Sequence, residues 1–310
     1  MFMNSRRGIP VKYRLFLMMI PFIVLVTLFA YLPLFGWRYA FFNYRPGMPL
    51  KMADFVGLEW FKSIISSPAR RMEILRVMRN TLAISGLGIA TSWLPIAFAI
   101  LLTEIRSASY KKLVQTLTTI PNFISWVLVY SFAFVLFSVD AGLVNRILIN
   151  LGFIDQGINF LLSPDHIWLK MTLWGIWKGL GWGAIMYLAA IAGIDQELYE
   201  AARVDGAGRF RQILHITLPG LLPTYFVLLM LAIANLINNG MDQYYVFRNA
   251  MNKDAIEVLD LYVYNIGFGR STTAGIPFAT AISMLKSAVS LSLLFAANRL
   301  SRILRGENIF

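Results

Sequence analysis

Six stretches of about 20 mostly apolar residues are spread along this 310-residue chain. About 20 apolar residues in a helix are enough to cross the hydrocarbon core of a bilayer. Lipid offers backbone N–H and C=O groups no hydrogen-bond partner, so such stretches must be helices that satisfy these groups internally. The sequence therefore predicts an all-α, polytopic transmembrane bundle of about six spans. The expected spans are residues 15–37, 81–102, 113–137, 169–192, 220–237 and 276–297.

The composition agrees with a membrane protein and excludes several classes of site. Hydrophobic residues make up 58% of the chain and charged residues 14%, whereas a soluble domain carries about 25% charged residues. The absence of cysteine excludes disulfides and thiolate metal sites, and two histidines are too few for a histidine-based metal site. We assign the net charge of +12 to loops and helix ends that face anionic lipid head groups, and we expect no nucleic-acid partner.

The spans divide the chain into four expected parts. Residues 1–37 form an N-terminal tail and first span, and 38–80 form an extracytoplasmic, interfacial segment. Residues 81–297 form the core, with a loop at 193–219, and 298–310 form a tail. The first span is too long for a cleaved signal peptide. Its N-terminal flank is basic, so we expect both termini in the cytoplasm.

No motif in the chain suits ATP hydrolysis or metalloprotease chemistry. The string G-x-x-x-x-G-K-[ST], which cradles nucleotide phosphates, does not occur, and neither does H-E-x-x-H. Carboxylates are also missing from the middle of the expected spans, since Glu104 and Asp242 lie near span ends. Proton-coupled carriers usually need such a carboxylate, so this pattern argues against a self-sufficient secondary carrier.

The loop between the fourth and fifth expected spans reads ELYEAARVDGAGRFRQILHITLP, from Glu197 to Pro219. Its first half contains good helix formers, and Gly206 is suited to end that helix in the left-handed conformation. Residues 209–217 are expected to form a second short helix, and Pro219 to begin the next span. A helix, a glycine turn and a helix form either a rigid knob that docks into another protein or an ordinary loop at the head-group level.

This loop resembles the signature of one transporter family. Glu200-Ala201-Ala202, Gly206, Ile216 and Leu218-Pro219 match E-A-A-x3-G-x9-I-x-L-P of the binding-protein-dependent ABC importer permeases. Further segments are similar to the maltose-type oligosaccharide permeases, and together they extend over nearly the whole chain. These segments are FVGLE at 55–59, NTL at 80–82, NGMDQ at 239–243, FATA at 278–281 and KS at 286–287.

The resemblance implies a type I ABC importer permease fold and a transporter subunit rather than an enzyme. In that family the signature loop couples the permease to a separate ATPase, which binds ATP and Mg²⁺, so this chain would bind no cofactor. The implied partners are a second, homologous permease, two ATPase subunits, an extracytoplasmic solute-binding protein, an oligosaccharide and the lipid of the bacterial cytoplasmic membrane. The residues expected to transmit coupling are Glu200, Ala201, Ala202, Arg203, Asp205 and Gly206.

Polar residues within the expected spans are candidates for the substrate pathway. Trp174, Lys178 and Trp182 share one helical face, on which the rings would stack on sugars and the ammonium would bond hydroxyls. The alternative is that Lys178 snorkels or pairs with the carbonyls of a neighbouring subunit. Gly175, Gly179 and Gly183 form a stripe suited to close helix packing. The other candidates are Asn235, Asn238, Asn239 and Lys286, where asparagine instead has the option of bonding across helices.

Two other functions remain open at this point. The first is a permease for another small solute, such as an osmolyte or an amino acid, since these permeases carry the same signature. The second is a self-sufficient secondary carrier, which predicts inverted repeats that the sequence does not display. A membrane scaffold would have no use for the coupling signature.

Overall fold

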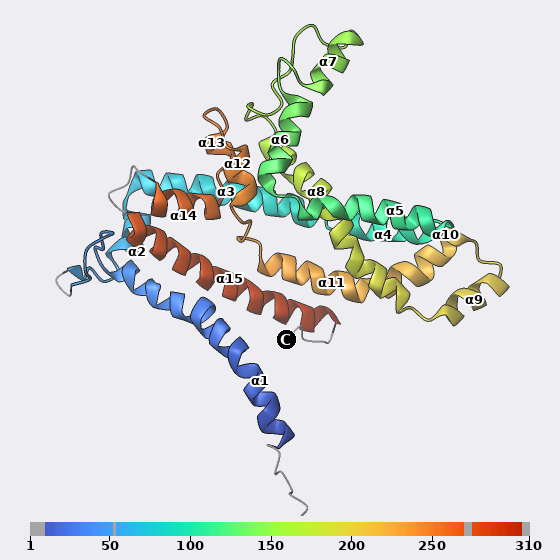
Figure 1. Ribbon diagram of the computed structural model, residues 1–310, viewed down its shortest axis with the longest axis horizontal. Helices are drawn as coiled ribbons and strands as arrows, with labels where there is room; N and C mark the ends of the chain where they lie inside the picture. The colour runs from blue at the N-terminus through green and yellow to red at the C-terminus, as the bar shows by residue number, and fades with distance from the viewer. Residues whose placement is uncertain (1–9, 52–53, 270–274, 306–310) are drawn as a thin grey trace, which may run out of the picture. The chain divides into compact units, whose positions relative to one another are not determined.

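Long helices joined by short loops make up the computed structural model, which describes residues 10–51, 54–269 and 275–305 (Figure 1). Five described helices are long and apolar enough to cross a membrane, and a sharply bent pair provides a sixth candidate. The helical, polytopic prediction is therefore confirmed. The ends of both predicted tails, residues 1–9 and 306–310, lie outside the described residues. The chain divides into two units, Met1–Ser66 with Ile266–Met284 and Ser67–Asn265 with Leu285–Phe310.

The first unit begins with one continuous apolar helix. α1 (Val11–Val26) continues through a π-helical turn, η1 (Thr27–Tyr31), into the 3-10 helix η2 (Leu32–Phe41). The most apolar part of this helix contains no buried residue among those described, as expected of a helix surrounded by lipid. After η2 the chain turns back, and the Trp60 ring N–H of α2 (Glu59–Ser66) donates to the Phe42 carbonyl at 3.1 Å. This unit also includes the first part of α15 (Gly275–Arg305).

The second unit is built around α8 (Ile167–Ala192), which packs against α3, α4, α5 and α11. Its apolar core includes Ile84, Val129, Met171 and Leu261, and a second cluster forms around Tyr187. In Figure 1, α7 stands beyond the end of α6, and α9 stands beyond the ends of α8 and α10. The remaining helices are α3 (Pro68–Ala90), α4 (Leu94–Glu104), α5 (Ala108–Thr119), η4 (Ile120–Phe123), α6 (Trp126–Phe137), α7 (Leu143–Asn150), α9 (Gln196–Val204), α10 (Arg209–Gln212), η5 (Ile213–Thr217), α11 (Leu218–Ala234), α12 (Asp242–Phe247), α13 (Lys253–Ile256) and α14 (Leu259–Phe268).

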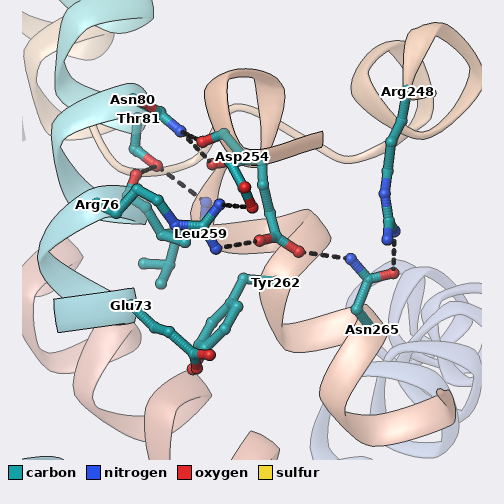
Figure 2. Close-up of polar contacts among 11 residues, drawn as sticks. Glu73, Arg76, Asn80, Thr81, Arg248, Asp254, Leu259, Tyr262 and Asn265 are labelled. Atoms are coloured by element: carbon teal, nitrogen blue, oxygen red, sulfur yellow. Dashed lines mark hydrogen bonds and ion pairs between the residues drawn. The ribbon is translucent and has the colours of Figure 1, made fainter. Parts of the chain in front are cut away.

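The second span starts earlier than the sequence predicted. Residues 68–80, expected in an interfacial segment, are the first half of α3. Their polar side chains are used within the chain, because α3 lies beside α13 and α14 (Figure 2). The Arg79 guanidinium lies 5.6 Å from the centre of the Trp168 ring, so this arginine does not need a lipid head group to hold it.

A polar network fastens this half of α3. Arg76 donates to the carboxylates of Asp254 and Glu257, and Tyr262 donates to Glu73 at 3.0 Å (Figure 2). Burial and the neighbouring Glu73 carboxylate raise the pKa of Tyr262, so its hydroxyl remains a donor. The fully buried Asn80 donates to the Asp254 and Glu257 carbonyls at 2.9 and 3.1 Å. The network thus ties segments about 180 residues apart in the sequence.

The third span, expected as one helix over residues 113–137, is broken. The helix through α5 and η4 meets α6 at 109°. Pro121 lies in η4 without an N–H, and the Ser125 hydroxyl starts a new helix by accepting from the Leu128 N–H at 3.4 Å. Backbone carbonyls at the break need hydrogen-bond donors from elsewhere in the protein, because lipid offers none.

The predicted glycine stripe on α8 is wrong in part. A Cβ placed on Gly175 or Gly179 would meet no atom within 4 Å, so neither glycine makes a close helix contact within this chain. A Cβ on Gly183 would lie 3.3 Å from the Pro95 ring. At Gly181, which the stripe omitted, a Cβ would lie 2.3 Å from the Thr118 carbonyl oxygen, so the close approach of α5 depends on this glycine.

The helix that contains Pro219 begins earlier than predicted. The helix runs on from Arg209 through α10, η5 and α11 to Ala234. The π-helical turn at Ile213–Thr217 widens the helix just before the proline, whose missing N–H leaves an i−4 carbonyl free there.

Candidate functional site

A cavity with a largely apolar wall and several polar groups lies among α3, α4, α8 and α12, on the side of α8 that carries Gly175 and Gly179. Its volume is about 340 Å³, and the bare glycine faces contribute to this space. The described lining has hydroxyl and amide groups but no charged side chain. These polar groups come from Ser85, Thr91, Ser92, Thr172, Asn239, Gln243 and Tyr244. Neutral donors and acceptors of this kind suit an uncharged polyhydroxyl group better than a metal ion.

Asn239 is the cavity residue with unused hydrogen-bonding capacity. Its Nδ2 donates to the Ser85 hydroxyl at 2.9 Å, and that hydroxyl donates to the Leu236 carbonyl at 2.6 Å. Its Oδ1 is buried and has no hydrogen-bond partner among the described residues, and the Asn239 side chain neighbours the Tyr244 hydroxyl. Burial raises the pKa of Tyr244 to about 12, so its hydroxyl stays neutral and able to donate. An orphaned buried acceptor is costly, and a ligand hydroxyl would satisfy it.

The other two predicted asparagines form bonds near the end of α11. Asn235 donates to the Leu231 carbonyl at 2.9 Å. Asn238 donates to Asn235 Oδ1 at 3.3 Å and to the Ser290 hydroxyl of α15 at 3.2 Å. The structure therefore brings one of the three asparagines into the cavity and uses the other two to shape the turn before it.

Lys178 binds the broken span. Its Nζ donates to the carbonyls of Pro121 and Asn122 at 3.0 and 2.6 Å and lies 5.5 Å from the Trp126 ring centre. The Pro121 carbonyl also accepts from the Ile124 N–H at 3.2 Å, so Lys178 adds a second donor at the end of η4. Lys178 thus bonds backbone carbonyls, but these belong to its own chain and not to a neighbouring subunit as the alternative predicted. Its role in substrate passage stays a prediction.

The two tryptophans of the same face lie in different surroundings. Trp182 is 51% exposed and meets Phe123 edge to face, with ring centres 5.7 Å apart. Trp174 packs against Phe137 and Phe247 and lines a separate, apolar cavity of about 320 Å³. Only Trp182 keeps an exposed ring near Lys178.

Lys286 pairs with Asp260, a carboxylate that was not among the residues predicted from the sequence. Its Nζ donates to Asp260 in the first turn of α14. An ammonium in a membrane-spanning helix requires a partner, so Asp260, at the start of an apolar helix, was the signal available in the sequence.

The signature loop folds as its glycine predicts. Asp195 begins α9 by accepting from the Glu197 N–H at 3.0 Å. At the other end, Gly206 has φ +74°, its N–H donates to the Arg203 carbonyl, and the Ala207 N–H donates to the Ala202 carbonyl. This pair of bonds is a Schellman motif, which requires a residue in the left-handed region at Gly206.

The loop is anchored at its base and bare at its tip. Tyr199 bonds the Thr217 hydroxyl at 2.9 Å, and Gln212 donates to the Ala207 carbonyl at 2.8 Å. Among the coupling candidates, Glu200, Ala201, Arg203, Asp205 and Gly206 are exposed and Ala202 is half-buried. Val204 is 88% exposed. An apolar residue held so far into solvent on a rigid turn is typical of a docking surface.

Comparison with known proteins identifies the family. Residues 94–306 match the family described as binding-protein-dependent transport system inner membrane component. The chain belongs to this family. The match covers the signature loop and the part of the cavity that follows residue 93, and it confirms the importer permease interpretation and a role as a transport subunit.

Relatives resemble this permease over nearly its whole length. The Bacillus subtilis protein LplB is 38% identical over 297 residues, which cover 96% of this chain and 91% of LplB. The B. subtilis polygalacturonan/rhamnogalacturonan transport system permease protein YteP is 40% identical over 300 residues, covering 96% and 90%. A chain in the crystal structure of a bacterial alginate ABC transporter bound to a periplasmic protein carrying alginate pentasaccharide matches with a TM-score of 0.83. It is 30% identical, and the match covers 99% of this permease and the whole of that chain.

Proposed function

We propose that this permease carries an oligosaccharide into a bacterial cell, and that the cavity around Asn239 binds the sugar during passage. The observation that carries the substrate class is the cavity lining, a set of neutral hydroxyls and amides with one buried acceptor unused. The polygalacturonan/rhamnogalacturonan permease YteP and the alginate transporter support the same class, since both handle polysaccharides.

The sugar path extends from this cavity along α8. The exposed face of Trp182 offers a stacking surface, while Lys178 holds the broken span in place beside it. Lys286 and the asparagines Asn235 and Asn238 act from outside the cavity, by fixing the segments that border it. Trp174 contributes through packing in the neighbouring apolar cavity.

The signature loop transmits the force that moves the permease. A separate ATPase, which binds ATP and Mg²⁺, receives the exposed tip of α9, and Glu200 and Arg203 pair with charges in its socket. Ala201 and Ala202 allow close approach, and Asp205 and Gly206 form the turn that makes the knob rigid. Anchoring by Tyr199 and Gln212 passes a displacement of the tip into α11.

The complete importer contains a second, homologous permease, two ATPase subunits and an extracytoplasmic solute-binding protein. It lies in the bacterial cytoplasmic membrane, with both termini and the signature loop in the cytoplasm and α7 outside. The helix α1, bare along its most apolar part, faces lipid.

Purification of the intact complex with its binding protein tests this proposal. Mass spectrometry of the bound ligand should find an oligosaccharide, and liposomes containing the complex should accumulate it with ATP. Galacturonate oligosaccharides and neutral oligosaccharides of the same length distinguish an acidic from a neutral sugar. An amino acid or an osmolyte bound and imported in place of a sugar would refute the substrate class.

A further inference from the structure

Two carboxylates near the start of α14 each fasten a different part of the second unit. Glu257 accepts from Arg76 of α3 at 2.9 Å and from Asn265 at 2.7 Å (Figure 2). Asp260, three residues later, accepts from Lys286 of α15 through Oδ1 and from the Gly240 N–H through Oδ2 at 2.9 Å. Glu257 therefore stabilises α3, whereas Asp260 reaches the turn that follows α11.

The contact between Asp260 and Gly240 lies next to the cavity. Gly240 has φ +71°, so it forms the turn directly after Asn239, whose buried Oδ1 borders the cavity. The residue before Asn239 is also held, because Asn238 donates to Ser290 at 3.2 Å. Both neighbours of Asn239 are thus tied to α15, through Lys286 with Asp260 on one side and Ser290 on the other.

The two α15 residues act from one face of the helix. Lys286 and Ser290 are four residues apart, and side chains at this spacing lie one above the other. The Lys286 and Asp260 side chains are 17% and 21% exposed, so little water screens the pair. A half-buried carboxylate without its ammonium partner would leave a charge unpaired, which costs free energy. The two side chains are therefore held together in one arrangement.

We propose that Asp260 and Lys286 are positioning residues that direct the Asn239 amide into the sugar cavity, an inference that rests on the function proposed above. The Lys286 ammonium holds the Asp260 carboxylate in place, and this carboxylate accepts from the backbone N–H of Gly240. This bond holds the turn that carries Asn239. Asp260 and Lys286 need no contact with the sugar. Their effect on transport passes through Asn239.

Hydrogen exchange of the purified complex tests the geometric step without any sugar. Asp260→Ala should speed exchange of the Gly240 amide by about tenfold or more, since that amide loses a bond to a charged acceptor. Glu257→Gln is the matched control, because it alters the carboxylate one turn away and leaves Asp260 in place. Equal exchange at Gly240 in the wild type and in Asp260→Ala would overturn the proposal.

A double-mutant cycle in liposomes tests the effect on transport, with trigalacturonate and the neutral trisaccharide maltotriose as alternative probes. Asn239→Ala and Asp260→Ala should each slow uptake, by about three- to tenfold, and the double variant should be no slower than the slower single variant. Glu257→Gln combined with Asn239→Ala should instead give the product of the two single effects. Multiplied losses in the Asp260 and Asn239 pair would show that Asp260 acts on its own and would refute the positioning role.

Failure of the proposed function gives a different result. If the wild-type complex imports neither trisaccharide while its binding protein is active, the substrate class is refuted for sugars of this length. The exchange of the Gly240 amide still decides whether Asp260 holds the turn.

Discussion

Gly206 offers a sharp test of the signature loop because Gly208, two residues away, differs from it in one decisive respect. A Cβ on either glycine would meet no atom within 4 Å, so steric clash is excluded at both positions. Gly206 has φ +74°, whereas Gly208 has φ −68° and ψ 165°, which any residue adopts. Replacing each glycine with serine therefore separates backbone strain from the addition of a side chain.

The expected cost at Gly206 follows from the backbone alone. A residue with a Cβ is about 1–2 kcal/mol less stable in the left-handed region, which corresponds to a factor of about 5–30 in the population of the native turn. Gly206→Ser should lower sugar import driven by ATP by about this factor while the chain still inserts and assembles. Gly208→Ser should have little effect, because serine is a good residue to begin a helix. Gly206→Asn should recover part of the activity, since asparagine tolerates this region.

The assay compares ATP hydrolysis and sugar uptake by the same liposomes. Gly206→Ser should raise the number of ATP molecules hydrolysed for each sugar imported, and Gly208→Ser should leave this ratio unchanged. Equal behaviour of the two serine variants would refute the argument that the left-handed turn at Gly206 sets the coupling geometry.

Three other predictions concern the remainder of the chain. Lys178→Met should lower the thermal stability of the complex, because the carbonyls of Pro121 and Asn122 lose charge-assisted bonds at membrane depth; unchanged stability and import would contradict this. Asn80→Ala should destabilise the chain by about 1–3 kcal/mol, because two buried carbonyls lose their donor, and denaturant unfolding should detect the change. A cysteine at Ala108 should resist an impermeant thiol reagent in intact cells, since we place this loop in the cytoplasm; the chain has no native cysteine to interfere.

The sequence by itself determined the parts of the protein that depend on local chemistry. Long apolar stretches must be helices in lipid, whatever surrounds them. The turn at Gly206 follows from a single residue's conformational freedom, and the spacing of Glu200, Ala201, Ala202 and Gly206 was sufficient to indicate the family. These features needed no knowledge of which helices are neighbours.

Only the tertiary structure decided what the polar residues of the spans do. A lysine in an apolar helix indicates that a hydrogen-bonding partner must exist. Which group acts as the partner depends on residues that are distant in the sequence. Lys178 found carbonyls more than 50 residues away, at a break in a span that the sequence predicted as continuous. Gly175 and Gly179, spaced as if for packing, border open space because their neighbours approach α8 elsewhere. Periodicity specifies which residues share a helix face, whereas the cavity, the ion pair of Lys286 with Asp260 and the buried Asn239 acceptor arise from how separate helices meet.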